Sequence, residues 1–436
     1  MDNVLLTAGS ILVASILIIL ILIKPYFGII FTMVSLPMVD LLPEIPFLSS
    51  VVILIGAATL LGFFAQKMRD GKPFLKLGSI HIISLLLVGW IFISNPEAAW
   101  FGVDRNWILT FIQLWVLIWL TSELMNSPKK QQVFMWIFSI VTAISAVIAI
   151  QQGNIGNTVG ESLRAIGLAG NPNATARYFV LALMFFSYLA LVSNKSFPRL
   201  VAIGGGIITF LGVFFTLSRT GIILLILALG LIILIIPRRK SRIWLFLAYI
   251  SAALILWFSS ESIFDILKSI MPSIMEGTDT IGLRYRLWQA AIQMWLDHPF
   301  QGVGIGMYAQ LMRFYAPEVA RTYLVLGVHN TYLQFLVETG LIGFSLILVL
   351  LITSLRNFSQ TCKKDDRKNI FLRHFWLIVF LVNLVGQITL NGTTDKLLWF
   401  LMGVSVYFHN QFVLRTREIA VHKLGKNKQS NAYEKA

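Results

Sequence analysis

The stretch from residue 200 to 236 is apolar almost throughout and holds one charged side chain, Arg219. A single helix over these residues would be about 55 Å long, whereas the hydrocarbon core of a membrane is about 30 Å thick. The stretch therefore predicts a hairpin of two membrane-spanning helices with its turn at residues 218–221. Gly221 is expected to permit the tight bend. Arg219 then lies at a membrane interface and not in the middle of the bilayer.

Apolar stretches of similar length recur along the chain. The 436 residues are 57% hydrophobic and 13% charged, whereas soluble proteins carry about 25% charged residues. The stretches have helical length and lack the alternation of barrel strands, so we expect an all-α integral membrane protein with a bundle of about 12 or 13 spanning helices. Pro37 and Asp40 interrupt the second stretch, and the lower number applies if it is re-entrant. The expected spans are residues 4–23, 26–41, 48–66, 78–94, 107–125, 132–151, 174–193, 199–217, 220–236, 242–258, 329–354, 371–390 and 395–414.

Basic residues gather at every second connection between these spans. The positive-inside rule places those connections in the cytoplasm and the remaining ones outside. The net charge of +15 follows from this topology, so nucleic acid is not expected as a partner. The basic connections are residues 67–76, 129–130, 195–199, 238–242 and 356–373. The chain then divides into spans within 1–258, a large external loop at 259–328 with amphipathic helices, further spans within 329–414 and a basic cytoplasmic tail at 415–436.

Two further features limit the function classes. The single cysteine, Cys362, lies in a charged connection, which excludes an internal disulfide and a cysteine metal site. The outer side carries no HExxH or DxD motif, so no metal and no cofactor are expected. The first apolar stretch, 4–23, lacks a basic start and a cleavage site, and it is expected to be a retained membrane helix.

Arginines on the outer side are the unusual charges, because the positive-inside rule explains the others. Arg219 lies in a short turn and cannot move far from the bundle. Arg164 and Arg177 flank a loop rich in glycine and asparagine, LRAIGLAGNPNATARY, in which Asn173 is expected to cap the next helix. An interfacial anchor is the alternative explanation for any one of these arginines.

The external segment GLRYRLWQAAIQMWLDHP predicts an amphipathic helix that lies along the membrane or protein surface. Arg284 falls at the end of its apolar stripe, where an arginine requires a partner, and an anion is the natural one. Arg286 falls on the opposite, polar face. The apolar stripe contains Leu287, Trp288, Ala291, Met294 and Trp295, and the polar face contains Gln289, Gln293 and Asp297.

The segment VHNTYLQFLVETGLIGFSLIL places His329 at the outer mouth of a spanning helix. An unperturbed imidazole has a pKa of about 6.5, which suits proton transfer near neutral pH. Taken alone, such a histidine can equally be structural, but several arginines on the same side favour a functional role. The preceding PFQGVGIGM is interpreted as a flexible turn and not as a nucleotide-binding loop, because no βαβ unit surrounds it.

Four segments stand in the order RAIGLAGNPN, LSRTG, GLRYRLW…DHPFQGVGIGM and HNTYLQFLVETGLIG. This succession resembles the O-antigen ligase and polymerase superfamily over roughly residues 150 to 410. SRTG and HNxYLQxxxExGxxG carry most of the likeness. The resemblance implies a multi-pass protein of the bacterial inner membrane whose active site faces the periplasm or exterior. It also implies transfer of a glycan from an undecaprenyl-pyrophosphate carrier to an acceptor, either lipid A–core or another glycan.

The resemblance assigns catalytic roles to Arg219, Arg284 and His329. The arginines would stabilise the charge of the departing diphosphate without a metal ion, and the histidine would take the proton of the attacking hydroxyl, with inversion of the anomeric centre. Further residues expected to bind substrate are Arg164, Arg286, Arg177 and Asn330. Membrane lipid is the remaining expected partner.

Two alternatives stay open. A polymerase of the same superfamily would look similar, although the HN…ExG segment and the compact size favour a ligase. A transporter for an anionic lipid or polysaccharide would also line a cavity with arginines. Ion-coupled carriers keep carboxylates within their spans, whereas four carboxylates of this chain lie near predicted ends or breaks of spans. These are Asp40, Glu123, Glu338 and Asp395.

Overall fold

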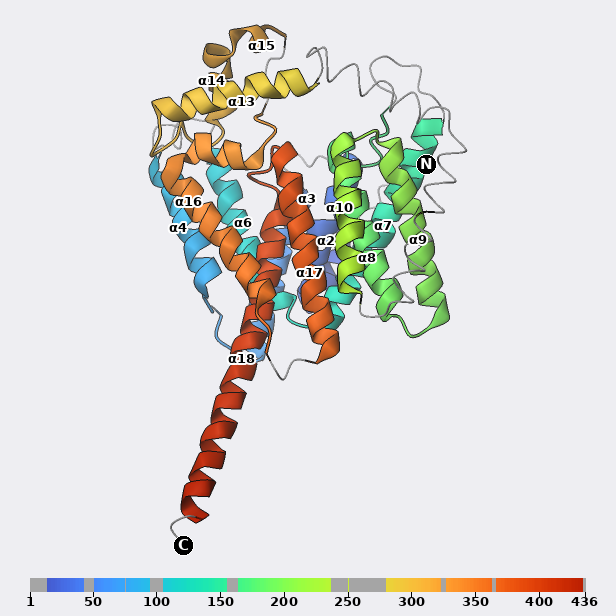
Figure 1. The fold of residues 1–436 in the computed structure, drawn as a ribbon, viewed down its shortest axis with the longest axis vertical. Coiled ribbons are helices and arrows are strands. Elements are labelled where there is room, and N and C mark those ends of the chain that lie inside the picture. Colours follow the sequence, from blue (N-terminus) through green and yellow to red (C-terminus); the bar gives the residue numbers. More distant parts are fainter. Residues whose placement is uncertain are drawn as a thin grey trace.

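The computed structural model is a bundle of helices with a helical cap over one end (Figure 1). It describes residues 14–42, 51–74, 76–94, 105–154, 164–236, 250, 280–322, 327–362 and 366–433. We call the end covered by the cap the cap end, and the opposite end, from which the C-terminal helix projects, the tail end.

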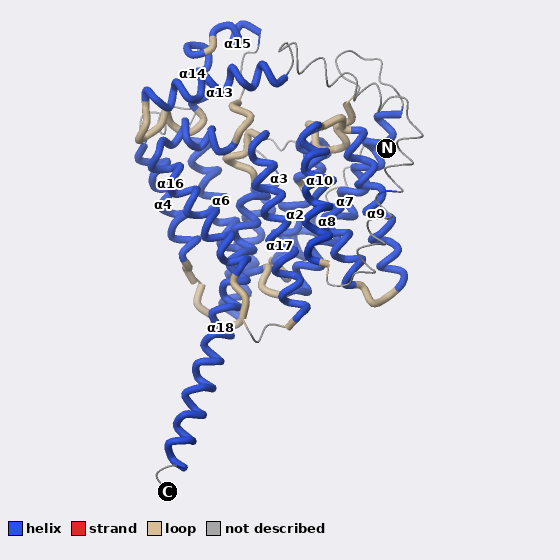
Figure 2. The backbone as a smooth tube through the Cα atoms, in the orientation of Figure 1, coloured by secondary structure: helices blue, strands red, loops and turns tan. Residues whose placement is uncertain are grey.

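The described residues form helices and no strand (Figure 2). The bundle consists of α2 (Tyr26–Val34), the 3-10 helix η1 (Leu36–Leu41), α3 (Val51–Arg69), α4 (Ser79–Ser94), α6 (Arg105–Leu124), α7 (Pro128–Asn154), α8 (Pro172–Val192), α9 (Ser196–Phe215), α10 (Arg219–Ile235), α16 (Thr331–Ser359), α17 (Arg367–Gly386), η2 (Gln387–Thr389) and α18 (Lys396–Tyr433). The cap consists of α13 (Thr280–Asp297), α14 (Met307–Tyr315) and α15 (Pro317–Thr322).

Within the described residues, eight helices are long and apolar enough to cross a membrane. Three shorter apolar helices, Ala14–Ile23, α4 and α10, match further expected spans. The protein is therefore an all-α, multi-pass integral membrane protein, as the apolar stretches predicted. The expected span at 242–258 lies outside the described residues except for Ile250.

The interrupted stretch at 26–41 forms the short α-helix α2 followed by η1. Its start lies near the beginning of α7, where the Lys130 ammonium is 5.4 Å from the centre of the Tyr26 ring. Its end lies beyond the other end of α7, where the Asp40 N–H donates to the carbonyl of Leu168 at 3.1 Å. A 3-10 helix rises further per residue than an α-helix, so the change at Pro37 lets this short segment reach from one end of α7 to the other.

The apolar stretch 200–236 forms the expected hairpin of α9 and α10, but its turn differs from the expectation. Leu217, with φ of 50°, adopts the left-handed conformation, and Gly221 lies inside α10. A Cβ on Gly221 would come within 2.5 Å of the Cβ of Ala176. The glycine therefore serves the close approach of α10 to α8, and the expectation that it forms the bend was wrong.

The last helix also differs from its expected extent. The span predicted to end at residue 414 continues through the basic tail, and α18 runs to Tyr433. Its outer part projects from the tail end, away from the cap (Figure 1). No proline interrupts residues 415–433, and lysine, arginine, glutamate and glutamine tolerate helix well, so the helix has no local reason to stop at the membrane boundary.

The cap packs on the start of α16 through the apolar stripe of α13. Leu287, Ala291 and Met294 are fully buried there. The indole N–H of Trp288 donates to the carbonyl of Val328 at 3.0 Å. This contact brings the first turns of α13 next to the segment that leads into α16.

A second contact joins the glycine-rich turn before α14 to a break in α16. Gly340 interrupts α16 with φ of 64° and ψ of −172°. The N–H of Val303 donates to the carbonyl of Val337 at 2.9 Å, and the N–H of Leu341 donates to the carbonyl of Pro299 at 2.8 Å. The turn expected to be flexible is thus anchored by backbone hydrogen bonds, and it redirects the first part of α16.

We predict that Gly340→Ala destabilises the protein, because the backbone region of Gly340 is open almost only to glycine and a Cβ would collide with Phe300. The strained backbone alone corresponds to about 1–3 kcal/mol. Thermal unfolding of the detergent-solubilised protein measures the effect. Gly230→Ala in α10 is the control, since a Cβ there meets no atom within 4 Å. Equal melting temperatures for both variants would contradict the prediction.

Candidate functional site

Arg164 lies in the loop between α7 and α8, and hydrogen bonds fix its guanidinium. Its Nε donates to the carbonyl of Thr216 at 3.3 Å, and another nitrogen donates to Oδ1 of Asn173 at 2.9 Å. The same Oδ1 accepts from the hydroxyl of Ser218 at 2.8 Å. Asn173 therefore connects the loop before α8 to the turn before α10.

The capping residue of α8 is Asn171 and not Asn173, which corrects the sequence-based expectation. The Asn171 side chain accepts from the backbone N–H groups of Asn173 and Ala174. Pro172 takes the first helical position, where its missing N–H costs nothing. The side chain of Asn173 is therefore available to orient Arg164.

Arg219 is the first residue of α10. The Ser218 hydroxyl caps this helix by accepting from the N–H of Gly221 at 3.1 Å. A positive side chain at a helix N-terminus adds to the positive end of the helix dipole and is unfavourable by itself. An anion at this end would interact favourably with both the side chain and the free backbone N–H groups.

Three arginines interact electrostatically although they come from distant segments. Burial lowers the pKa of Arg164, and the charges of Arg219 and Arg284 lower it further. Burial and the charge of Arg219 likewise lower the pKa of Arg284. Among the described residues, neither Arg164 nor Arg284 forms an ion pair with a carboxylate. The site therefore concentrates positive charge in a partly desolvated place.

His329 completes this group. Burial lowers its pKa from the ordinary value of 6.5, and the charge of Arg284 lowers it further. The imidazole is therefore neutral at neutral pH and lies near that arginine. We call Arg164, Arg219, Arg284 and His329 the arginine–histidine cluster. It lies at the cap end, where the loop before α8, the start of α10, α13 and the start of α16 approach one another.

The backbone of His329 is held in an uncommon conformation, with φ of 54°. Its N–H donates to Oδ1 of Asn391, and Nδ2 of Asn391 lies 3.5 Å from Nδ1 of the ring. A Cβ on Gly327 would collide with the same amide. Asn391 thus positions His329 from a segment 62 residues away, and sequence reasoning missed it. In the sequence, only the position of Asn391 in the short external connection before the last span indicated that it could lie near the site.

The other three expected substrate-binding residues have different surroundings. Arg177 forms a buried ion pair with both carboxylate oxygens of Asp395, at 2.6 and 3.1 Å. Asn330 caps α16 by accepting from the N–H groups of Tyr332 and Leu333. Arg286 is exposed on the polar face of α13, as predicted, and the helix separates it from the apolar stripe.

In the part of the chain that the structure describes, no three side chains among His, Cys, Asp and Glu come together in a way that could hold a metal ion. The cationic groups of the cluster are suited to anions. Three guanidinium groups offer many N–H donors in planar forks that match phosphate oxygens, and the neutral imidazole can accept a proton.

Comparison with known families bears on this arrangement. Residues 204–348 match the family model described as O-antigen ligase. This match spans about one third of the chain. The matched region includes Arg219, Arg284 and His329, and it confirms the family resemblance drawn from the sequence motifs. Arg164 and Asn391 lie outside the O-antigen ligase match, although the structure brings both to its residues. No curated protein matches the chain.

We predict that Asp395→Asn strongly destabilises the protein, because it leaves the Arg177 charge buried without its counter-ion. Breaking one side of a buried pair costs about 3–5 kcal/mol. The folded fraction after heating in detergent, measured by size-exclusion chromatography, reports the loss. The double variant R177M/D395L removes both charges and should recover much of the stability. A single variant as stable as the unchanged protein would contradict a structural role for the pair.

Proposed function

We propose that this protein is a glycosyltransferase that moves a glycan from an undecaprenyl-pyrophosphate carrier to an acceptor hydroxyl outside the inner membrane. The observation that carries the proposal is the arginine–histidine cluster, in which three positive charges and one neutral imidazole share a partly buried site. The O-antigen ligase match over residues 204–348 supports the same reaction class.

The cluster would hold the diphosphate of the donor. The donor has a sugar whose anomeric carbon is bonded to a phosphate oxygen, and negative charge grows on that oxygen as the bond breaks. Guanidinium groups stabilise this charge through paired hydrogen bonds, and the low polarity of the site strengthens the interaction. The N-terminus of α10 adds its N–H groups. Binding also relieves the repulsion among Arg164, Arg219 and Arg284.

His329 would act as the general base. The acceptor oxygen attacks the anomeric carbon, and its proton moves to the imidazole. At the same time the bond between the anomeric carbon and the phosphate oxygen breaks, and undecaprenyl pyrophosphate leaves with the bonding electrons. A direct displacement of this kind inverts the anomeric centre. Burial and the positive charge of Arg284 lower the pKa of His329 and favour the neutral ring before reaction, which is the form that accepts a proton.

Asn391 would position His329 mainly through its backbone. The 3.5 Å separation between Nδ2 of Asn391 and Nδ1 of His329 exceeds the usual hydrogen-bond range. The contact between Asn391 and the backbone N–H of His329 holds the residue in its uncommon backbone conformation.

The cluster would face the periplasm or the exterior. The basic connection near Lys67 and the basic part of α18 are at the tail end, and the positive-inside rule assigns that end to the cytoplasm. Lys67 of α3 pairs with Glu123 of α6 at 2.6 Å, and Asp395, directly before α18, pairs with Arg177 of α8. Two carboxylates that an ion-coupled carrier could have used are thus held in ion pairs, which favours the enzyme over the transporter.

Ligase and polymerase differ in the acceptor and not in the chemistry of the cluster. A ligase uses lipid A–core or another acceptor, whereas a polymerase uses a second carrier-linked glycan. The description of the matching family favours the ligase.

We expect His329→Ala and Arg284→Ala to insert and fold normally while transfer falls by about 10²–10⁴-fold, the usual contribution of a general base or a charge-stabilising group. Release of undecaprenyl pyrophosphate from a lipid-linked donor by purified protein measures the reaction. Arg321→Ala, at an exposed cap arginine, should leave the rate unchanged. Wild-type rates in either cluster variant would rule out the assigned roles.

The proposed base also predicts the pH dependence. Because the pKa of His329 is lowered below 6.5, the rate should stay high through neutral pH and decline only below that value. Asn391→Asp places a negative charge beside the ring and raises the pKa of His329. The decline of the rate at low pH should therefore begin about one pH unit or more higher. Asn391→Leu, which removes the amide without adding charge, should lower the rate without that upward shift. A decline that begins at the same pH in Asn391→Asp would exclude His329 as the titrating base.

A further inference from the structure

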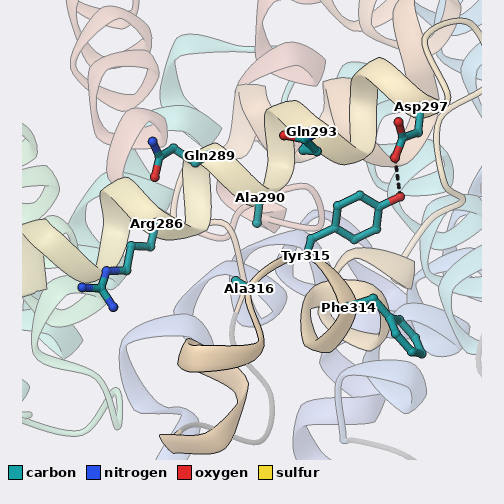
Figure 3. Close-up of a pocket in the computed structure, with 8 residues that line it drawn as sticks. All are labelled: Arg286, Gln289, Ala290, Gln293, Asp297, Phe314, Tyr315 and Ala316. Carbon is teal, nitrogen blue, oxygen red and sulfur yellow. Dashed lines mark hydrogen bonds between the residues drawn. The ribbon is translucent and has the colours of Figure 1, made fainter.

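An open groove of about 470 Å³ runs between α13 and the α14–α15 segment (Figure 3). This cap groove is lined by the polar face of α13 on one side and by two aromatic residues of α14 on the other. Its volume falls in the range of about 300–1,000 Å³ that is typical of small-molecule sites. The polar and aromatic lining consists of Arg286, Gln289, Gln293 and Asp297 of α13, with Phe314 and Tyr315 of α14.

The groove offers both donors and acceptors at an exposed surface. The two glutamine amides can each donate and accept, the Arg286 guanidinium donates, and the Asp297 carboxylate accepts. Asp297 already accepts from the hydroxyl of Tyr315 at 2.6 Å, which holds the Tyr315 ring across the groove. This hydrogen bond raises the pKa of Tyr315, so the hydroxyl keeps its proton. Hydroxyl-rich ligands match such a mixture, whereas a lipid chain or a simple anion does not.

Aromatic surface accompanies these polar groups. The Phe314 side chain is 67% exposed, and the Arg313 guanidinium lies 4.8 Å from the centre of its ring. An exposed phenylalanine at the edge of a polar groove presents a flat apolar face of the kind that receives the C–H face of a sugar ring. A row of polar groups beside an aromatic face therefore suits a carbohydrate, which has both hydroxyl groups and C–H faces.

The position of the groove indicates which glycan would occupy it. Arg286 is two residues from Arg284, which corresponds to about 200° around α13, so groove and cluster lie on different sides of a helix about 10–12 Å across. In Figure 1, α15 lies beyond α13 from the bundle, whereas α14 packs beside α13 and also contacts the first part of α16. A donor held by its diphosphate at the cluster has its free glycan end directed away from the membrane. An acceptor, in contrast, extends from its reacting hydroxyl back toward its own membrane anchor.

We infer that the cap groove binds the distal sugars of the donor glycan, and so gives the enzyme a preference for longer chains. The inference rests on the proposed function, because the direction of the donor follows from the cluster holding its diphosphate. In this arrangement Gln289 and Gln293 hydrogen-bond sugar hydroxyls, and Phe314 supports a sugar ring.

The test compares lipid-linked donors that carry one repeat unit with donors that carry several, using the full-length protein in detergent. For Q289A/Q293A we expect the KM for the long donor to rise about tenfold, with the KM for the single-unit donor and both kcat values unchanged. Gln301→Ala changes an exposed glutamine of the cap outside the groove and should alter neither. An unchanged KM for the long donor, or an equal rise for both donors, would overturn the inference.

A binding measurement separates this inference from the proposed function. The probe is the free oligosaccharide, released by mild acid from the lipid-linked glycan of the cells that make the protein. Calorimetry should detect its binding to the unchanged protein and to His329→Ala, and a loss of affinity of about tenfold in Q289A/Q293A. If transfer is never observed but the oligosaccharide binds as expected, the proposed reaction is wrong and the cap groove is still a glycan-binding site. If the oligosaccharide binds the unchanged protein and Q289A/Q293A equally, or binds neither, the groove assignment fails.

Discussion

Mutual repulsion among Arg164, Arg219 and Arg284 is the constraint on which the site depends. Burial and, after it, the neighbouring like charges lower the pKa values of Arg164 and Arg284, so keeping these groups charged raises the free energy of the protein. The fold tolerates this because rigid contacts oppose the separation of these groups. Asn173 connects the Arg164 loop to Ser218, the residue that caps α10. The helical cap that carries Arg284 packs on the first part of α16. Under the proposed function, the diphosphate of the donor would therefore find its binding groups already oriented.

Arg177 shows what the same side chain does when the protein supplies the counter-charge. Its guanidinium is matched by both oxygens of Asp395, and Gln387 donates to that carboxylate as well. Such an arrangement stabilises the packing of α8 against the C-terminal helices and leaves little capacity for a ligand. Arg164 and Arg284, in contrast, form no ion pair with a carboxylate among the described residues.

Glycine contacts set the position of the histidine. Gly302 and Gly340 approach so closely that neither can carry a side chain, and the turn before α14 hydrogen-bonds to α16 at this break. The first part of α16 is thereby redirected under the cap, and His329 stands at its beginning. The PFQGVGIGM and ExG motifs are separate in the sequence, but they contain the residues that meet at this contact.

Length and periodicity determined much of this protein from the sequence alone. The apolar stretches specified the membrane bundle, the hairpin that brings Arg219 to an interface, and the two faces of α13, because each of these depends on residues close together in the chain. The tertiary structure decided which polar groups meet. Asn391 anchors His329 and Asp395 neutralises Arg177 from segments far away in the sequence. No local pattern encodes such contacts, since they depend on how separate helices pack and on which side chains then become neighbours.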